Sequence, residues 1–143
     1  MGSSISAYWP GIEEAQGEAQ PGFYNNCEPW ADWTIRRGDE PAVLETLRGL
    51  GLAAIETFTT DGVDDSEVKW VSPAELKVAA TRLRDLILAH DPRVKPVVQS
   101  YACGARHESP PEEQFAQDLA DIAGMADFAE HEGAKRITLR IGW

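Results

Sequence analysis

The sequence is short of cysteine and of long apolar runs, and each shortage excludes a class of protein. Cys27 and Cys103 are the two cysteines in 143 residues, too few for the disulfide framework of a small secreted domain. No charged start followed by an apolar run marks a signal peptide, so we expect a reducing, cytoplasmic compartment. No window reaches the roughly 18 apolar residues of a membrane span, and we expect no membrane partner.

Basic residues are also scarce, because 13 Lys and Arg face 24 Asp and Glu, which gives a formal net charge of −11. A surplus of negative charge repels nucleic-acid phosphates, so we expect no nucleic-acid partner. The same field speeds the approach of a basic protein, although an acidic surface is also common among soluble proteins of bacterial type.

The overall composition is that of a folded globular protein. The chain is 43% hydrophobic and 26% charged, whereas disordered chains have too little apolar surface to offset chain entropy. A length of 143 residues suits one hydrophobic core. We expect a single domain over residues 1–143, and the sequence leaves its oligomeric state open.

The clearest structural signal lies at residues 67–90, where a short β-type run meets an amphipathic helix. Ser72 can cap the helix, Glu75 can complete a capping box, and Pro73 suits the first helical position. One stripe then follows the 3.6-residue period of a helix. Its members are Leu76, Ala80, Leu83, Ile87 and His90.

The remaining elements follow from periodicity and turn residues. Strands are expected at 4–9, 34–37, 53–59, 67–71 and 135–141. Helices are expected at 39–50, 73–90 and 109–132, the first capped by Asp39 and the last by Ser109. The last has an apolar stripe of Phe115, Leu119, Ile122, Ala126 and Ala129. In the first strand Ile5, Ala7 and Trp9 share one side opposite Tyr8, and in the final strand Ile137, Leu139 and Ile141 share one side opposite Arg136 and Arg140. The strands 53–59 and 67–71 would pair as a hairpin, and residues 93–103 fit either a helix or a strand. The predicted fold is α+β, with a single layer of largely antiparallel mixed sheet and about three helices packed on it.

Three pieces of the chain carry a resemblance to a known family. They are Met1-Gly2, the Val-Ser-Pro-Ala-Glu-Leu run at 71–76, and the helix end and final strand at 128–141. Together they resemble the YfbM-like family of small uncharacterised bacterial proteins, while the segments 21–33 and 61–67 depart from its pattern. The resemblance implies an α+β fold and supplies no established catalytic residues.

Cysteine and histidine suggest two kinds of chemistry. Cys103 and His107 are four residues apart, and Cys27 could join them as a third soft ligand. Structural zinc sites usually use four ligands, often from paired Cys-x2-Cys knuckles that this chain lacks, so we expect no metal and no cofactor. The same residues could form a catalytic pair, with Cys103 or Cys27 as the nucleophile and His107 as the base. The simpler structural alternative is a buried cysteine and a surface histidine.

An acidic loop is the first candidate for recognition. Asp61, Asp64, Asp65 and Glu67 place four carboxylates within seven residues. Their spacing does not match the twelve-residue calcium loop. A solvated hairpin tip explains the cluster, and binding of a basic partner is the functional alternative.

The aromatic stretch at 21–37 is the second candidate. Tyr and Trp combine large contact area with a polar group and are enriched where binding energy concentrates. The candidate binding residues are Tyr24, Asn25, Asn26, Trp30, Asp32 and Trp33. The structural alternative is a plug of tryptophans in the core beneath a long loop.

These observations lead to two functional hypotheses. The first is a non-catalytic protein-interaction module, similar in role to an immunity protein, that binds a basic partner through residues 61–67. The second is a small-ligand-binding or hydrolase-like site in which residues 23–33 act with Cys103 and His107. Convergence of the cysteines and the histidine in one cleft would favour the second.

Overall fold

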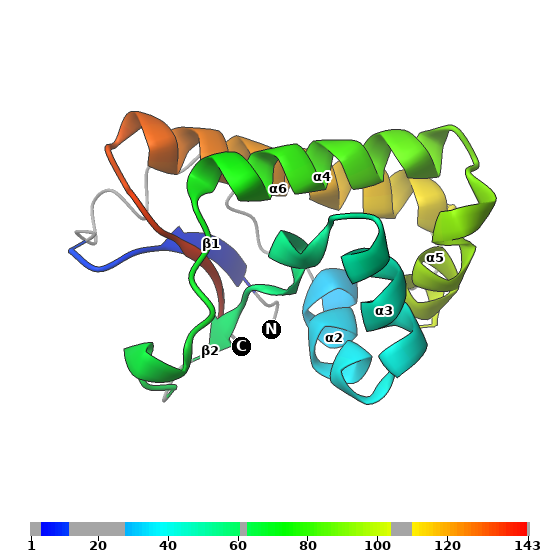
Figure 1. Ribbon diagram of the computed structural model, residues 1–143, viewed down its shortest axis with the longest axis horizontal. Coiled ribbons are helices and arrows are strands. Elements are labelled where there is room, and N and C mark those ends of the chain that lie inside the picture. Colours follow the sequence, from blue (N-terminus) through cyan, green and yellow to red (C-terminus); the bar gives the residue numbers. More distant parts are fainter. Residues whose placement is uncertain (1–3, 12–27, 61–62, 104–109, 143) are drawn as a thin grey trace.

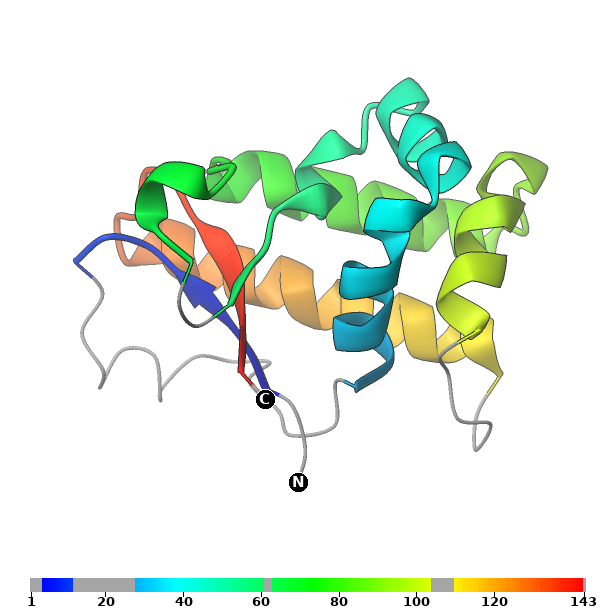
Figure 2. The same ribbon diagram turned by 90° about the horizontal axis from the view of Figure 1, so that it is seen from below.

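The computed structural model describes residues 4–11, 28–60, 63–103 and 110–142, and the account below concerns these ranges. Two long helices lie side by side and run in opposite directions, with a small sheet against one end and shorter helices against the other (Figures 1 and 2). The helices are α2 Glu28–Arg36, α3 Pro41–Gly49, α4 Pro73–Leu88, α5 Lys95–Ala102 and α6 Pro111–His131. Short 3-10 turns are η1 Arg37–Asp39, η2 Ala53–Glu56, η3 Asp65–Glu67 and η4 Pro92–Val94.

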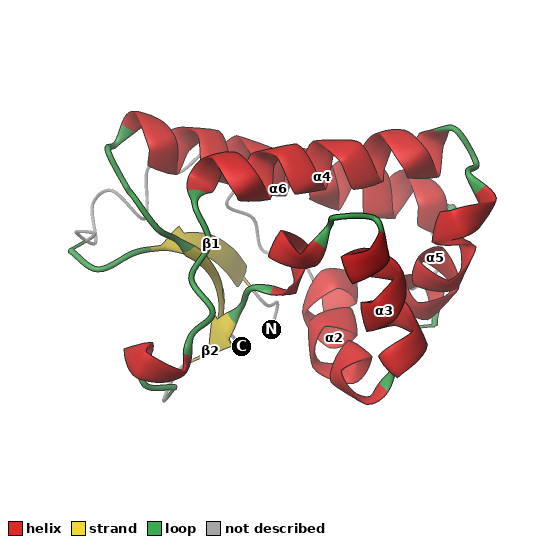
Figure 3. Ribbon diagram, viewed as in Figure 1, coloured by secondary structure: helices red, strands yellow, loops and turns green. Residues whose placement is uncertain are grey.

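The sheet is small and mixed. Its strands are β1 Ser4–Tyr8, β2 Thr59–Thr60 and β3 Thr138–Gly142, in the order β1-β3-β2. β3 pairs antiparallel with β1 and parallel with β2. The α+β class is therefore confirmed. The finer expectations are only partly met, because the short pairing of β2 with β3 is parallel and the described residues form five helices rather than about three (Figure 3).

Helix α4 follows its sequence signal closely. The Ser72 side chain accepts from the backbone N–H of Glu75, and the Glu75 side chain accepts from that of Ser72, so the capping box is present. The predicted stripe is buried from Leu76 to Ile87. His90 is the exception, because the helix ends at Leu88 and His90 is exposed at a left-handed φ of 55°.

Helix α6 confirms its predicted face but not its predicted cap. Its buried stripe contains Phe115, Leu119, Ile122, Ala126 and Ala129. Pro110 occupies the N-cap position and makes no side-chain hydrogen bond, and Ser109 lies outside the described residues. Within the described residues, Pro110 and Pro111 stand at the start of this helix, and Glu112 and Glu113 lie in its first turn.

The predicted hairpin is wrong within the described residues. The segment expected as strand 53–59 contains the 3-10 turn η2, and Thr59–Thr60 pairs with β3 instead. Val71 makes a single antiparallel bridge to Ile137. Both segments therefore pair with the C-terminal part of the chain, Thr59–Thr60 with β3 and Val71 with the residue just before it, rather than with each other.

Two further segments are helical where the sequence favoured or allowed a strand. Thr34 and Ile35 are β-branched, but the predicted strand 34–37 is wrong because Trp30, Trp33 and Arg37 share one buried helical face across α2 and η1. Residues 95–102 form α5. Helix α3 begins after Glu40 rather than at a cap by Asp39.

The buried apolar side chains of the described residues form one cluster between the long helices, the sheet and the short helices. Ile5, Ala7 and Trp9 on β1 and its extension face this cluster, as their alternation predicts. Across the described ranges, no helix combines the length and the apolar character needed to cross a bilayer.

Candidate interaction surface

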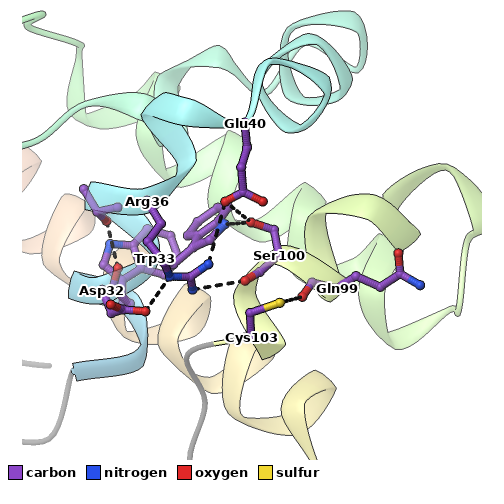
Figure 4. Close-up of polar contacts among 9 residues, drawn as sticks. Asp32, Trp33, Arg36, Glu40, Gln99, Ser100 and Cys103 are labelled. Carbon is purple, nitrogen blue, oxygen red and sulfur yellow. Dashed lines mark hydrogen bonds and ion pairs between the residues drawn. The ribbon is translucent and has the colours of Figure 1, made fainter.

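The two candidate tryptophans lie in the core rather than on the surface. Trp30 and Trp33 are 1% and 0% exposed, and their rings meet edge-on with centroids 5.1 Å apart. The Trp33 indole N–H donates to Ser100 Oγ at 3.0 Å, and Ser100 Oγ in turn donates to Glu40 at 3.0 Å (Figure 4). The structural alternative, a core plug, therefore describes these two residues, and a partner cannot contact them in this conformation.

Asp32 belongs to the same helix and has a local structural role. Its carboxylate accepts from Arg36 Nε at 2.6 Å, and Arg36 Nη2 donates to the Ser100 carbonyl at 3.1 Å (Figure 4). Asp32 thereby orients the arginine that ties α2 to α5. The other candidates of the aromatic stretch, Tyr24, Asn25 and Asn26, lie outside the described residues.

Cys103 is exposed and follows helix α5 as its C-cap residue. Its thiol donates to the Gln99 carbonyl with the sulfur 3.3 Å from the oxygen (Figure 4). Cys27 and His107 lie outside the described residues, so the cysteine–histidine site stays a prediction. Within the ranges that the structure describes, His, Cys, Asp and Glu nowhere gather in threes as a metal site requires.

The acidic segment, by contrast, lies on the surface. Asp64, Asp65 and Glu67 are exposed, and η3 projects from a corner of the molecule away from the long helices (Figure 1). Asp64 accepts from the Ser66 N–H at 3.0 Å and so caps the turn. Asp61 lies outside the described residues.

A stack of aromatic rings and arginines adjoins this acidic turn. The rings of Tyr8 and Trp70 stack with centroids 6.0 Å apart. The guanidinium carbon of Arg136 lies 4.8 Å from the Trp70 ring centroid, and that of Arg140 lies 5.5 Å from the centroid of Tyr8. We call these four residues the ladder. Cation–π contacts of this kind hold the guanidinium groups against the ring faces.

Hydrogen bonds join the ladder to the acidic turn. The Tyr8 hydroxyl donates to the Asp65 carboxylate at 3.4 Å, and the Trp70 indole N–H donates to the Asp65 carbonyl at 3.2 Å. Strand register explains the contact between Tyr8 and Arg140. Tyr8 opposes Thr138, so it lies on the same face of the sheet as Arg140, two residues further along β3. Ladder and turn together form the η3 surface: Asp64, Asp65, Glu67, Tyr8, Trp70, Arg136 and Arg140.

Comparison of the chain with protein-family models, curated proteins and solved structures finds no match in any of the three.

The η3 surface brings together side chains of several chemical kinds. It offers two half-buried aromatic rings, exposed arginines and exposed carboxylates, which are groups that contact and orient a partner. Sequence reasoning identified the carboxylates but missed Tyr8, Trp70, Arg136 and Arg140. The alternation of β1 and β3 already placed Tyr8 and Arg140 on outward faces, but only their pairing brings the two together.

Proposed function

We propose that the protein is a non-catalytic interaction module, comparable to an immunity protein, that binds a basic protein through the η3 surface. The observation that carries this proposal is the Tyr8–Trp70 stack beside the exposed carboxylates of η3. Tyr, Trp and Arg are the residues enriched where interfaces concentrate their binding energy. The scarcity of cysteine and the resemblance to the YfbM-like family support a bacterial, cytoplasmic setting.

Charge and aromatic contact have separable roles in this proposal. The net charge of −11 and the η3 carboxylates attract a basic partner over a distance, which raises the association rate. The Tyr8 and Trp70 rings are preordered by their stack, so they lose little side-chain entropy on binding. Once covered, they slow dissociation.

The experiment begins with a partner captured from the native host and continues with association and dissociation rates measured over a range of salt. Raising the salt concentration should slow association markedly, because the screening length is about 8 Å at physiological ionic strength. The triple variant D64N/D65N/E67Q should lower the association rate at low salt. The control E45Q/D85N/E130Q removes the same charge at exposed positions on α3, α4 and α6 and should have a smaller effect.

The variant Trp70→Ala tests the proposed role of the aromatic rings in slowing dissociation. A hot-spot residue contributes about 2 kcal/mol or more, which corresponds to a roughly 30-fold faster dissociation. Val78→Ala, at an exposed apolar residue on α4, is the control and should leave dissociation unchanged. Kinetics that respond neither to salt, nor to the carboxylates, nor to Trp70 would refute the proposal.

A further inference from the structure

Arg37 is a buried arginine with an unused hydrogen-bond donor. It is 2% exposed, and its Nη2 donates to the Ile55 carbonyl at 3.1 Å. The guanidinium carbon lies 4.6 Å from the Trp33 ring centroid. Nη1 has no hydrogen-bond partner within the described part of the chain. A buried charged donor left unpaired is costly to stability, so the position calls for an explanation.

Glu56, whose negative charge acts on Arg37, is already engaged elsewhere. Glu56 accepts from Arg48 through both oxygens, at 2.7 Å from Nη2 and 3.1 Å from Nε. Burial lowers the pKa of Arg37 to about 10, and the negative charge of Glu56 only partly offsets this. Arg37 therefore stays charged at neutral pH with part of its guanidinium unsatisfied.

A hollow of about 370 Å³ lies against Arg37. Its lining comes from α2, η1 and α3 and from the segment between η2 and Lys69. Its volume falls within the range of small-molecule sites. Ile35, Phe58 and Val63 form an apolar part of its wall and are themselves exposed.

The charges around the hollow suit a single negative charge. Arg37, Arg48 and Lys69 supply three positive groups, and Glu56 and Glu67 supply two negative ones, a formal sum of +1 in a chain whose total is −11. A carboxylate matches this balance, and it accepts hydrogen bonds from a guanidinium in the geometry that arginine offers. A dianionic phosphate would meet the two glutamates as well, so it fits less well.

We propose that this hollow binds a small monocarboxylate with an apolar chain, its carboxylate accepting from Arg37 Nη1 and its chain lying along Ile35, Phe58 and Val63. In this conformation Nη1 is covered, so binding displaces a side chain at the rim. The site contains none of the ladder residues, and it shares one residue, Glu67, with the η3 surface.

The test is a titration of the isotope-labelled full chain with hexanoate, followed by NMR. Hexanoate should produce saturable shifts in the amide signals of Ile35, Phe58 and Val63 and in the guanidinium signals of Arg37. Hexanamide has the same chain without the charge and should bind about tenfold more weakly or worse. Equal responses to the two probes, or no saturable response to hexanoate, would overturn the proposal.

A matched pair of variants locates the charge. Arg37→Met keeps the side-chain length without the charge and should weaken hexanoate binding about tenfold or more. Arg84→Met makes the same change at an exposed position on α4 and should leave binding unchanged. If Arg37→Met does not fold, Phe58→Ala takes its place and should weaken binding by removing apolar wall. If whichever of these two variants is used folds and still binds hexanoate as tightly as the unmodified protein, the proposed site is wrong.

Discussion

Replacing Leu83 by Ala tests whether the α4–α6 contact organises the core. Leu83 is 0% exposed, at the centre of the α4 stripe. The change removes three carbons, worth roughly 2.4 kcal/mol at about 0.8 kcal/mol each. The unfilled cavity adds to this loss, so we expect a total of about 2.7–5 kcal/mol. Native domains typically have a stability of roughly 5–15 kcal/mol, so we expect the variant to fold with reduced stability.

The assay is urea unfolding followed by circular dichroism, compared with Val78→Ala on the same helix. Val78 is 66% exposed, and its truncation should change the free energy of unfolding by about 0.5 kcal/mol or less. The dependence on urea should keep its slope in both variants, because the surface exposed on unfolding hardly changes. A loss below about 1 kcal/mol for Leu83→Ala would mean that the α4 stripe is not a close-packed contact.

Two further predictions concern polar groups. The Tyr101 hydroxyl donates to buried Asp118 at 2.5 Å, so Tyr101→Phe should lower the free energy of unfolding by about 1–3 kcal/mol. The control Tyr8→Phe loses an exposed hydrogen bond and should change this free energy by about 0.5 kcal/mol or less. Similar losses for both variants would contradict this reasoning. Hydrogen bonds from the side chain and backbone of Arg93 lower the pKa of Asp91 from 3.8 to about 2, so Asp91 stabilises the fold above pH 3.8 and loses that contribution as the pH falls toward 2. Carboxyl NMR should show the pKa of Asp91 rising in Arg93→Ala, and an unchanged pKa would refute the role of the arginine.

Local signals predicted the long helices well, and the reason is physical. The capping box at Ser72 and Glu75 satisfies backbone groups within a few residues of each other. The buried faces of α4 and α6 follow from helical periodicity alone. Such features depend on near neighbours in the chain, so no knowledge of the rest of the fold is needed to predict them.

Short β-branched segments were predicted poorly because their propensity is weak compared with tertiary packing. Thr34 and Ile35 favour a strand, yet Trp30, Trp33 and Arg37 can be buried together only if this segment is helical. The segment around Ile55 buries that side chain through the turn η2 rather than in a strand. In both places the gain from burial exceeds the preference of individual residues.

The sequence by itself determined the acidic charge, the α+β class and the inward faces of β1, α4, α6 and β3. Only the tertiary structure decided that Trp30 and Trp33 are core residues while Tyr8 and Trp70 stack at the surface. An aromatic side chain suits a core and an interface equally well, so residue type cannot separate the two. Periodicity shows which residues share a face of an element, but the element that covers this face is chosen by packing between distant parts of the chain.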